Sequence, residues 1–304
     1  MMFTRRQWLI GSCSTMGVMA LHSVASAHAI DPIPRRGAFS ARLSLAAYSY
    51  RDYLTGKKSP KMTLFDVADR ASEMGIAAIE PTAYYFTSTQ KSELAKLKTH
   101  CARLGLDISG GAIGNNFCVR NDKKRADELR KTKEWIEHYA ALGAKTIRIF
   151  AGNLEKGDTI EEARKRCIEA IHEACDHAAE YGVLLALENH GGITATADQL
   201  LEIVQAVKHH QFGVNLDTGN FHSDDPYTDV ARLAPYAVTV QFKTEIKRGK
   251  QPKEPADASR MIDALRQSKY QGYVVLEYEA AEDPLQAIPQ HIKNLKQCLG
   301  ISSA

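Results

Sequence analysis

A buried strand that ends in charged and polar side chains is the first chemically informative stretch of this sequence. Residues 183–190 read VLLALENH, so an apolar run is followed directly by Glu188, Asn189 and His190. Burying a carboxylate and an imidazole is costly unless a partner charge or a metal ion pairs with them. The rest of the chain must therefore supply that partner.

Acidic and amide side chains stand at the ends of other apolar runs as well. They are Glu80, Asp217, Gln241 and Glu277, with Lys243 and Glu279 two residues beyond the last two. Carboxylates that lie close together raise one another's pKa unless a cation is bound among them. Oxygen-rich ligation favours a divalent ion such as Mn, Mg or Co over a structural zinc ion. The open alternative is that these acids are salt-bridge partners of Lys243, Arg148 and other basic residues.

Eight short apolar runs alternate with amphipathic segments from residue 43 onward. The runs cover residues 43–50, 76–82, 106–114, 144–152, 183–190, 212–219, 237–245 and 273–279. Most are continuously apolar, as expected for strands buried on both faces. Several helical segments between them end in a glycine, at Gly75, Gly105, Gly143 and Gly182, where a helix favours a left-handed residue. This alternation predicts an α/β protein with a (β/α)8 barrel. The competing architecture, a doubly wound open sheet, usually has a glycine-rich phosphate loop after its first strand, which AYSYRDYLTG does not provide.

The expected organisation is a signal peptide over residues 1–29, an extended lead-in over 30–42 and a single barrel over 43–304. The N-terminus carries Arg5 and Arg6, then a weakly apolar stretch, then small residues around Ala27 and Ala29. It resembles a twin-arginine export signal, which implies recognition by the twin-arginine translocase and a periplasmic or secreted protein. An anchor helix is disfavoured because the apolar run is shorter than the ~20 residues that a membrane span needs.

The composition is that of an ordinary globular protein, with 44% hydrophobic and 25% charged residues among 304. The formal net charge is +3, and loss of Arg5 and Arg6 would lower it to +1. Without a basic stripe, the chain is not expected to bind nucleic acid or an anionic membrane. The five cysteines after residue 29 form no CxxC pair, so we expect buried thiols rather than a disulfide framework.

Four motifs carry a family resemblance. LALENHGG, VNLDTGNFH, VQFKTEI and VVLEYE, in this order, resemble the sugar isomerase and epimerase family of xylose isomerase-like TIM barrels, over nearly the whole chain after the signal. The resemblance implies metal ligation by Glu188, Asp217, Gln241 and Glu277. Many members carry His at the position of Gln241, although an amide can still coordinate a metal through its carbonyl oxygen.

The activity that this resemblance implies is the isomerisation or epimerisation of a sugar through a metal-stabilised enediolate, formed by proton abstraction next to a carbonyl. Glu188 and Glu277 would exchange the proton, and His190 lies on the same strand face as Glu188 and can act beside it. The predicted substrate-binding residues are Glu80, His222, Lys243 and Tyr48. Export, and the lack of an arginine cluster, predict an unphosphorylated sugar. Family barrels often pair, so a homodimer is a further expectation.

Three other functions are known or conceivable for a barrel of this type. Barrels of this type also act as lyases or hydratases on 3-keto-glycosides, and the first chemical step is the same. The second is an exported sugar-binding protein without catalytic activity, in which Gln241 would mark the loss of a former metal site. An abasic-site endonuclease is disfavoured, because it needs a histidine-rich trinuclear zinc centre and a basic groove.

Overall fold

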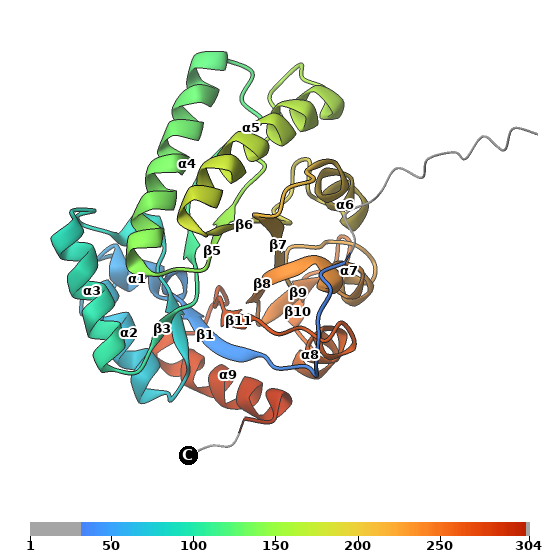
Figure 1. Cartoon of the computed structure of the whole chain (residues 1–304). Coiled ribbons are helices and arrows are strands. Elements are labelled where there is room, and N and C mark those ends of the chain that lie inside the picture. Colours follow the sequence, from blue (N-terminus) through green and yellow to red (C-terminus); the bar gives the residue numbers. More distant parts are fainter. Residues whose placement is uncertain (1–31, 302–304) are drawn as a thin grey trace, which may run out of the picture.

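The computed structural model describes residues 32–301, which fold as a nearly closed parallel β-barrel surrounded by helices (Figure 1). The sheet order is β3-β2-β1-β11-β8-β7-β6-β5-β4. Its strands are β1 (Arg42–Ala46), β2 (Ala78–Glu80), β3 (Asp107–Ile108), β4 (Gly111–Ala112), β5 (Thr146–Ile149), β6 (Leu184–Glu188), β7 (Phe212–Asp217), β8 (Ala237–Phe242) and β11 (Tyr273–Leu276). Every pairing among them is parallel.

The third barrel strand is divided into β3 and β4, which is why nine strands form an eight-unit barrel. Ser109 and Gly110 lie in the break, and Gly111 begins β4, where a tyrosine of a neighbouring helix packs against the backbone. A Cβ atom on Gly111 would lie 2.2 Å from the ring of Tyr139, and the Tyr139 hydroxyl donates a hydrogen bond to the Pro81 carbonyl at 2.8 Å. The predicted (β/α)8 barrel is therefore confirmed, with one strand interrupted by close helix packing.

Helices follow the strands and cover the outside of the barrel (Figure 1). They are α1 (Arg51–Leu54), α2 (Leu64–Glu73), α3 (Lys91–Arg103), α4 (Asp122–Leu142), α5 (Ile160–Tyr181), α6 (Ala197–Ala206), α7 (Pro226–Leu233), α8 (Ala258–Gln267) and α9 (Pro284–Leu299). Side chains of Thr63, Thr159 and Thr196 cap the first turns of α2, α5 and α6. Gly143 and Gly182 end α4 and α5 in the left-handed conformation that the sequence predicts for them.

A two-stranded hairpin, which was not predicted from the sequence, extends one end of the barrel. The apolar run 237–245 is divided between β8 and β9 (Glu245–Lys247), and β9 pairs in antiparallel fashion with β10 (Lys253–Pro255). The division leaves Lys243 and Thr244 between the two strands, and the Lys243 backbone N–H donates to the Thr218 hydroxyl at 3.0 Å. The hairpin thus lies next to the C-terminal ends of β7 and β8.

The predicted signal peptide, with its twin arginine, lies outside the described residues. Residues 32–41 form no helix or strand, and within this segment the Arg35 guanidinium donates to the carbonyls of Ala234 and Ser268 at 3.0 Å each. In residues 32–301, no helix is both long and apolar enough to cross a membrane. The same residues contain five free cysteines, four of them buried.

Candidate active site

Polar and charged side chains are concentrated at the C-terminal ends of the barrel strands, where the register sets them side by side. Glu188 lies opposite Asn215, Asp217 opposite Gln241 and Ala46 opposite Glu80. Above these pairs lies a cavity of ≈ 220 Å³, whose lining includes Tyr48, Tyr84, Arg148, Phe150, Glu188, His190, Asn220, Lys243, Glu277 and Glu279. This face of a (β/α)8 barrel is where active sites of the fold are built.

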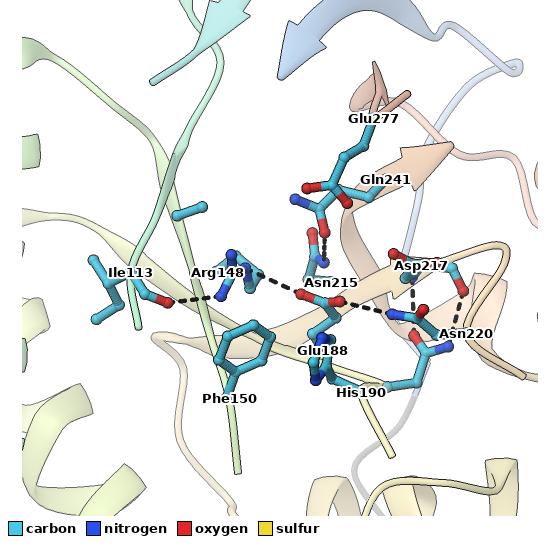
Figure 2. Close-up of polar contacts among 12 residues, drawn as sticks. Ile113, Arg148, Phe150, Glu188, His190, Asn215, Asp217, Asn220, Gln241 and Glu277 are labelled. Atoms are coloured by element: carbon cyan, nitrogen blue, oxygen red, sulfur yellow. Dashed lines mark hydrogen bonds and ion pairs between the residues drawn. The ribbon is translucent and has the colours of Figure 1, made fainter. Parts of the chain in front are cut away.

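Glu188 is buried at the floor of the cavity and pairs with a buried arginine (Figure 2). Its Oε2 lies 3.0 Å from Arg148 Nε as an ion pair, and its Oε1 accepts a hydrogen bond from Asn220 Nδ2 at 2.9 Å. Arg148 is held in place from two other sides, because it donates to the Ile113 carbonyl at 2.6 Å and lies 3.9 Å from the centre of the Phe150 ring. Burial raises the pKa of Glu188 well above its usual range, and Arg148 opposes that rise. A basic carboxylate next to a fixed cation is the result.

A buried lysine lies among three further carboxylates. Lys243 Nζ is 2.6 Å from Glu277 Oε2, 2.7 Å from Glu279 Oε2 and 3.5 Å from Asp217 Oδ2. Burial lowers the pKa of Lys243, but the three carboxylates outweigh burial and raise it well above its usual range. Gly219 is needed beside this lysine, because a Cβ atom at position 219 would lie 2.6 Å from the Cβ of Lys243. The ammonium is therefore charged and closely enclosed.

An amide chain connects the floor of the barrel to Glu80. Asn215 Nδ2 donates to Gln241 Oε1 at 2.7 Å, and Gln241 Nε2 donates to Glu80 Oε2 at 3.1 Å. Burial, followed by the charge of Glu277, raises the pKa of Glu80 to about 7. Asn189 connects two strands from the side, because it exchanges hydrogen bonds of 2.8 and 2.9 Å with the backbone of Asp217. These amides fix the orientation of the acidic groups.

Most of the residues that the sequence assigned to the site lie together here. Glu188 contacts Arg148, Asp217 and Glu277 contact Lys243, and Gln241 contacts Glu80, all at the C-terminal ends of the barrel strands. Tyr48 and His190 lie on the wall of the cavity. His222 lies apart, in a neighbouring cavity of ≈ 60 Å³ that also includes Asn220, Lys243 and Glu279. His190 packs against Phe150 with ring centres 4.3 Å apart, and burial and the charge of Arg148 lower its pKa. A neutral imidazole at neutral pH follows.

The roles of four residues in the site were not predicted from the sequence. Arg148 was considered only as a general salt-bridge partner, and Asn189, Asn215 and Asn220 were not singled out. Alternation along a strand was the available signal, because Asn215 precedes Asp217 by two residues and must share its face. For Arg148, the signal was a charge inside the otherwise apolar run TIRIF.

The family resemblance implies a divalent ion, and the contacts of the predicted ligands test its fit. Glu188 already contacts Arg148 and Asn220, and the Gln241 carbonyl accepts from Asn215. Glu277 pairs with Lys243. Asp217 Oδ2 is buried and accepts no hydrogen bond from the described residues. In the part of the chain that the structure describes, no three His, Cys, Asp or Glu side chains converge as a metal ion requires. As arranged, the residues do not fit a divalent ion. Glu188 instead forms a salt bridge with Arg148, and Glu277 forms one with Lys243.

The raised pKa of Glu80 predicts how the stability of the protein depends on pH. Between its ordinary value of 4.5 and its folded value of about 7, the folded chain binds more protons at Glu80 than the unfolded chain does. Stability therefore falls as pH rises through this window. Across this window the free energy of unfolding of the wild type should fall by up to about 3 kcal/mol. Glu80→Gln should remove this fall, which urea unfolding at the two ends of the window would measure. Glu93→Gln, at an exposed pair with Lys96, is the control. Equal pH slopes for the wild type and Glu80→Gln would contradict the prediction.

Comparisons with known proteins agree with this architecture. The family model described as "Xylose isomerase-like TIM barrel" matches residues 68–298. An inosose isomerase from Bacillus subtilis (strain 168) is 31% identical over 110 residues, which are 35% of this chain and 40% of that protein. A 3-dehydroshikimate dehydratase from Bacillus anthracis is 28% identical over 123 residues, or 38% of this chain and 44% of that protein. These two matches thus span less than half of each relative.

One relative is matched over most of its length. A putative hydroxypyruvate isomerase from Xenopus laevis is 25% identical over 252 residues, which are 76% of this chain and 90% of that protein. Among solved structures, a 3-keto-D-glucoside 4-epimerase from E. coli has a TM-score of 0.69 at 16% identity, over 85% of this chain and 100% of that chain. A D-psicose 3-epimerase has a TM-score of 0.66 at 18% identity, over 83% and 89%. These structures share the fold.

Proposed function

Because this chain belongs to the xylose isomerase-like TIM barrel family, we propose that it is an isomerase or epimerase of an unphosphorylated sugar or keto-sugar. The proposed reaction begins with removal of a proton from the carbon next to a carbonyl. The observation that carries the proposal is the buried Glu188 carboxylate, whose pKa is raised by burial and which lines the cavity beside fixed cations. A base of this kind and a nearby positive charge are what enolisation requires.

The proposed mechanism uses groups that all line the cavity. Glu188 takes the proton from the substrate carbon, and the electron pair moves to the carbonyl oxygen. Arg148 and Lys243 provide positive charge where that oxygen becomes negative. Glu277 directly follows β11, which β7 and β8 separate from β6 and Glu188, so it can return a proton from another direction. A divalent ion has no step in this proposal, because the residues as arranged do not fit one.

The charge pattern of the cavity supports an unphosphorylated substrate. Its two permanently charged cations, Arg148 and Lys243, are each already paired with carboxylates. A phosphate dianion in this cavity would lie against Glu188, Glu277 and Glu279 and be repelled. The twin arginine at residues 5 and 6 also supports this proposal, because it favours export to the periplasm or beyond, away from the cytoplasmic pool of sugar phosphates.

The test of the proposed function is proton NMR in deuterated water with a panel of free ketoses and 3-keto-glycosides. Each substrate is incubated with the protein in chelator and, separately, with Mg²⁺. Deuterium that enters next to the carbonyl, together with a new sugar isomer, would support the isomerase or epimerase. Neither exchange nor a new product from any member of the panel would contradict it.

A second candidate, a lyase or hydratase acting on a keto-glycoside, is favoured by a cavity beside the site. This cavity of ≈ 150 Å³ shares Phe150 and His190 with the main one and is otherwise lined by Asn115, Asn116, Ala151, Gly152, Asn153 and Thr194. Its uncharged amide and aromatic lining is suited to a second sugar ring. His190 lies between the two cavities, next to where the bond to that ring would break.

His190→Ala distinguishes the two candidates. In a lyase, the N–H group of the neutral His190 imidazole is placed to donate a hydrogen bond to the departing oxygen, so the variant should keep deuterium exchange but lose release of the aglycone by about 10²-fold or more. In an isomerase that works through Glu188 and Glu277, exchange and isomer formation should change together. His177→Ala, at a partly exposed outer pair with Glu137, is the control. Release of the aglycone at the wild-type rate would contradict the role of His190 in a lyase.

A further inference from the structure

We propose that Lys243 is the built-in cation of this site, and that its ammonium occupies the place among the acidic groups that a divalent metal ion would take. The position of this cation is inferred from the geometry alone. Its role in the reaction rests on the proposed function. It assigns to a side chain of this chain the electrostatic role that the family resemblance assigns to a metal.

The contacts of the ammonium exclude a divalent ion from the same position. Lys243 Nζ lies 2.6 Å from Glu277 Oε2 and 3.5 Å from Asp217 Oδ2, and these residues are two of the four ligands that the resemblance implies. A divalent ion would have to approach the same oxygens to about 2.0–2.6 Å. It would then lie beside the ammonium in a buried region, where repulsion between like charges is strong. One cation or the other can occupy this space.

The lysine is fixed in the site and is not a mobile surface side chain. Its side chain is 9% exposed, and its backbone N–H is bound to the Thr218 hydroxyl. Its stem passes Gly219 so closely that a Cβ atom at that position would lie 2.7 Å from Lys243 Cγ. Glu279 adds a third carboxylate contact at 2.7 Å. Moving the ammonium out would break its three acidic contacts at once.

The remaining predicted ligands are also engaged. The second buried cation, Arg148, pairs with Glu188, and Asn215 directs an N–H group at the carbonyl oxygen of Gln241. The other end of the Gln241 amide donates to Glu80. The oxygen atoms of Glu188 and Gln241 that a metal ion would need are thus already bound, one by a guanidinium group and the other by an N–H donor.

In the reaction, Lys243 is proposed to act on the substrate oxygen. When a carboxylate removes the proton from the carbon, the C–H electron pair forms the enediolate double bond and the carbonyl electron pair moves to oxygen. A Lys243 N–H group then donates a hydrogen bond to this oxygen. Return of the proton to the same or the neighbouring carbon completes an epimerisation or isomerisation, and no oxidant or reductant is consumed.

The test compares the wild-type protein with Lys243→Met and with the control Lys133→Met, which removes a lysine paired with Glu173 on the outer helices. Each protein is dialysed against chelator. Binding of Mn²⁺ alone is then measured by equilibrium dialysis, and the melting temperature is recorded with and without Mn²⁺. Without the ammonium, the carboxylates of Asp217, Glu277 and Glu279 lack their cation. Lys243→Met should therefore melt lower in chelator, bind about one Mn²⁺ per chain and melt higher with it.

The wild type and Lys133→Met should bind no stoichiometric Mn²⁺, and their melting temperatures should be equal in chelator and in Mn²⁺. Stoichiometric binding by the wild type that Asp217→Asn abolishes would overturn the proposal. A folded Lys243→Met that gains no affinity for Mn²⁺ would also overturn it. If Lys243→Met does not fold, Mn²⁺ binding by the wild type, compared with that by Asp217→Asn, still tests the proposal.

These measurements use no substrate, so they are independent of the proposed function. Absence of deuterium exchange with every sugar would contradict that function and leave the Mn²⁺ result standing. For an active protein, the exchange rate should be the same in chelator and in Mn²⁺, and Lys243→Met should lower it by about 10²-fold or more.

Discussion

Glu188→Gln is expected to lower the rate of deuterium exchange into the substrate by about 10²- to 10⁴-fold. The amide has nearly the shape of the carboxylate but cannot accept a proton from carbon. Its oxygen can still accept the hydrogen bond that Asn220 donates to Glu188 at 2.9 Å, so the local fold should persist. The measurement is the initial rate of exchange by NMR, together with the melting temperature of the variant.

Glu202→Gln is the matched control for this variant. Glu202 pairs with Arg164 at 2.7 Å but is 51% exposed and lies on an outer helix, so the change should leave exchange unaltered. If Glu188→Gln exchanged deuterium at nearly the wild-type rate, Glu188 would not be the base, and Glu277 would become the candidate to examine.

Arg148→Met is expected to destabilise the folded protein by about 3–5 kcal/mol, because it leaves a buried carboxylate without its cation. Arg148 and Glu188 have side-chain exposures of 5% and 3%. The change also removes the hydrogen bond to the Ile113 carbonyl and the contact with the Phe150 ring. The pKa of Glu188, which Arg148 holds down against burial, should rise further. Urea unfolding measures the stability, and a shift of the pH profile of exchange to higher pH reports the pKa.

A double variant and a surface control separate loss of the pair from loss of the side chain. Arg148→Met combined with Glu188→Gln removes both charges, so it should be more stable than Arg148→Met alone. Arg164→Met breaks the partly exposed pair with Glu202 and should cost about 1 kcal/mol or less. Equal destabilisation by Arg148→Met and Arg164→Met would mean that the Arg148–Glu188 pair does not stabilise the site.

The sequence by itself was sufficient to predict the barrel and the side of the barrel on which the polar groups gather. Continuous apolar runs alternate with amphipathic segments, and parallel strands joined by helices bring all their C-terminal ends to one rim. The period of two residues along a strand then requires Gln241 and Lys243 to share one face. For this reason Glu80, Glu188 and Asp217 could be grouped although they are far apart in the chain.

The division of the third strand and the hairpin β9–β10 could not be predicted in the same way. The break between β3 and β4 depends on the packing of Tyr139, a residue on α4, against Gly111. The hairpin depends on pairing between segments whose alternation is weak. Both features follow from contacts between residues that no local pattern connects.

Only the tertiary structure shows which basic side chains contact the acidic groups. The same acids fit a divalent ion or a set of salt bridges, and both alternatives remained open from the sequence. The distances from Arg148 to Glu188 and from Lys243 to Glu277 and Asp217 favour the salt bridges. A sequence pattern specifies on which face of a strand a side chain lies. The few ångströms that separate an ion pair from a metal ligand depend on strand register, on the space left by Gly219 and on the direction of each side chain.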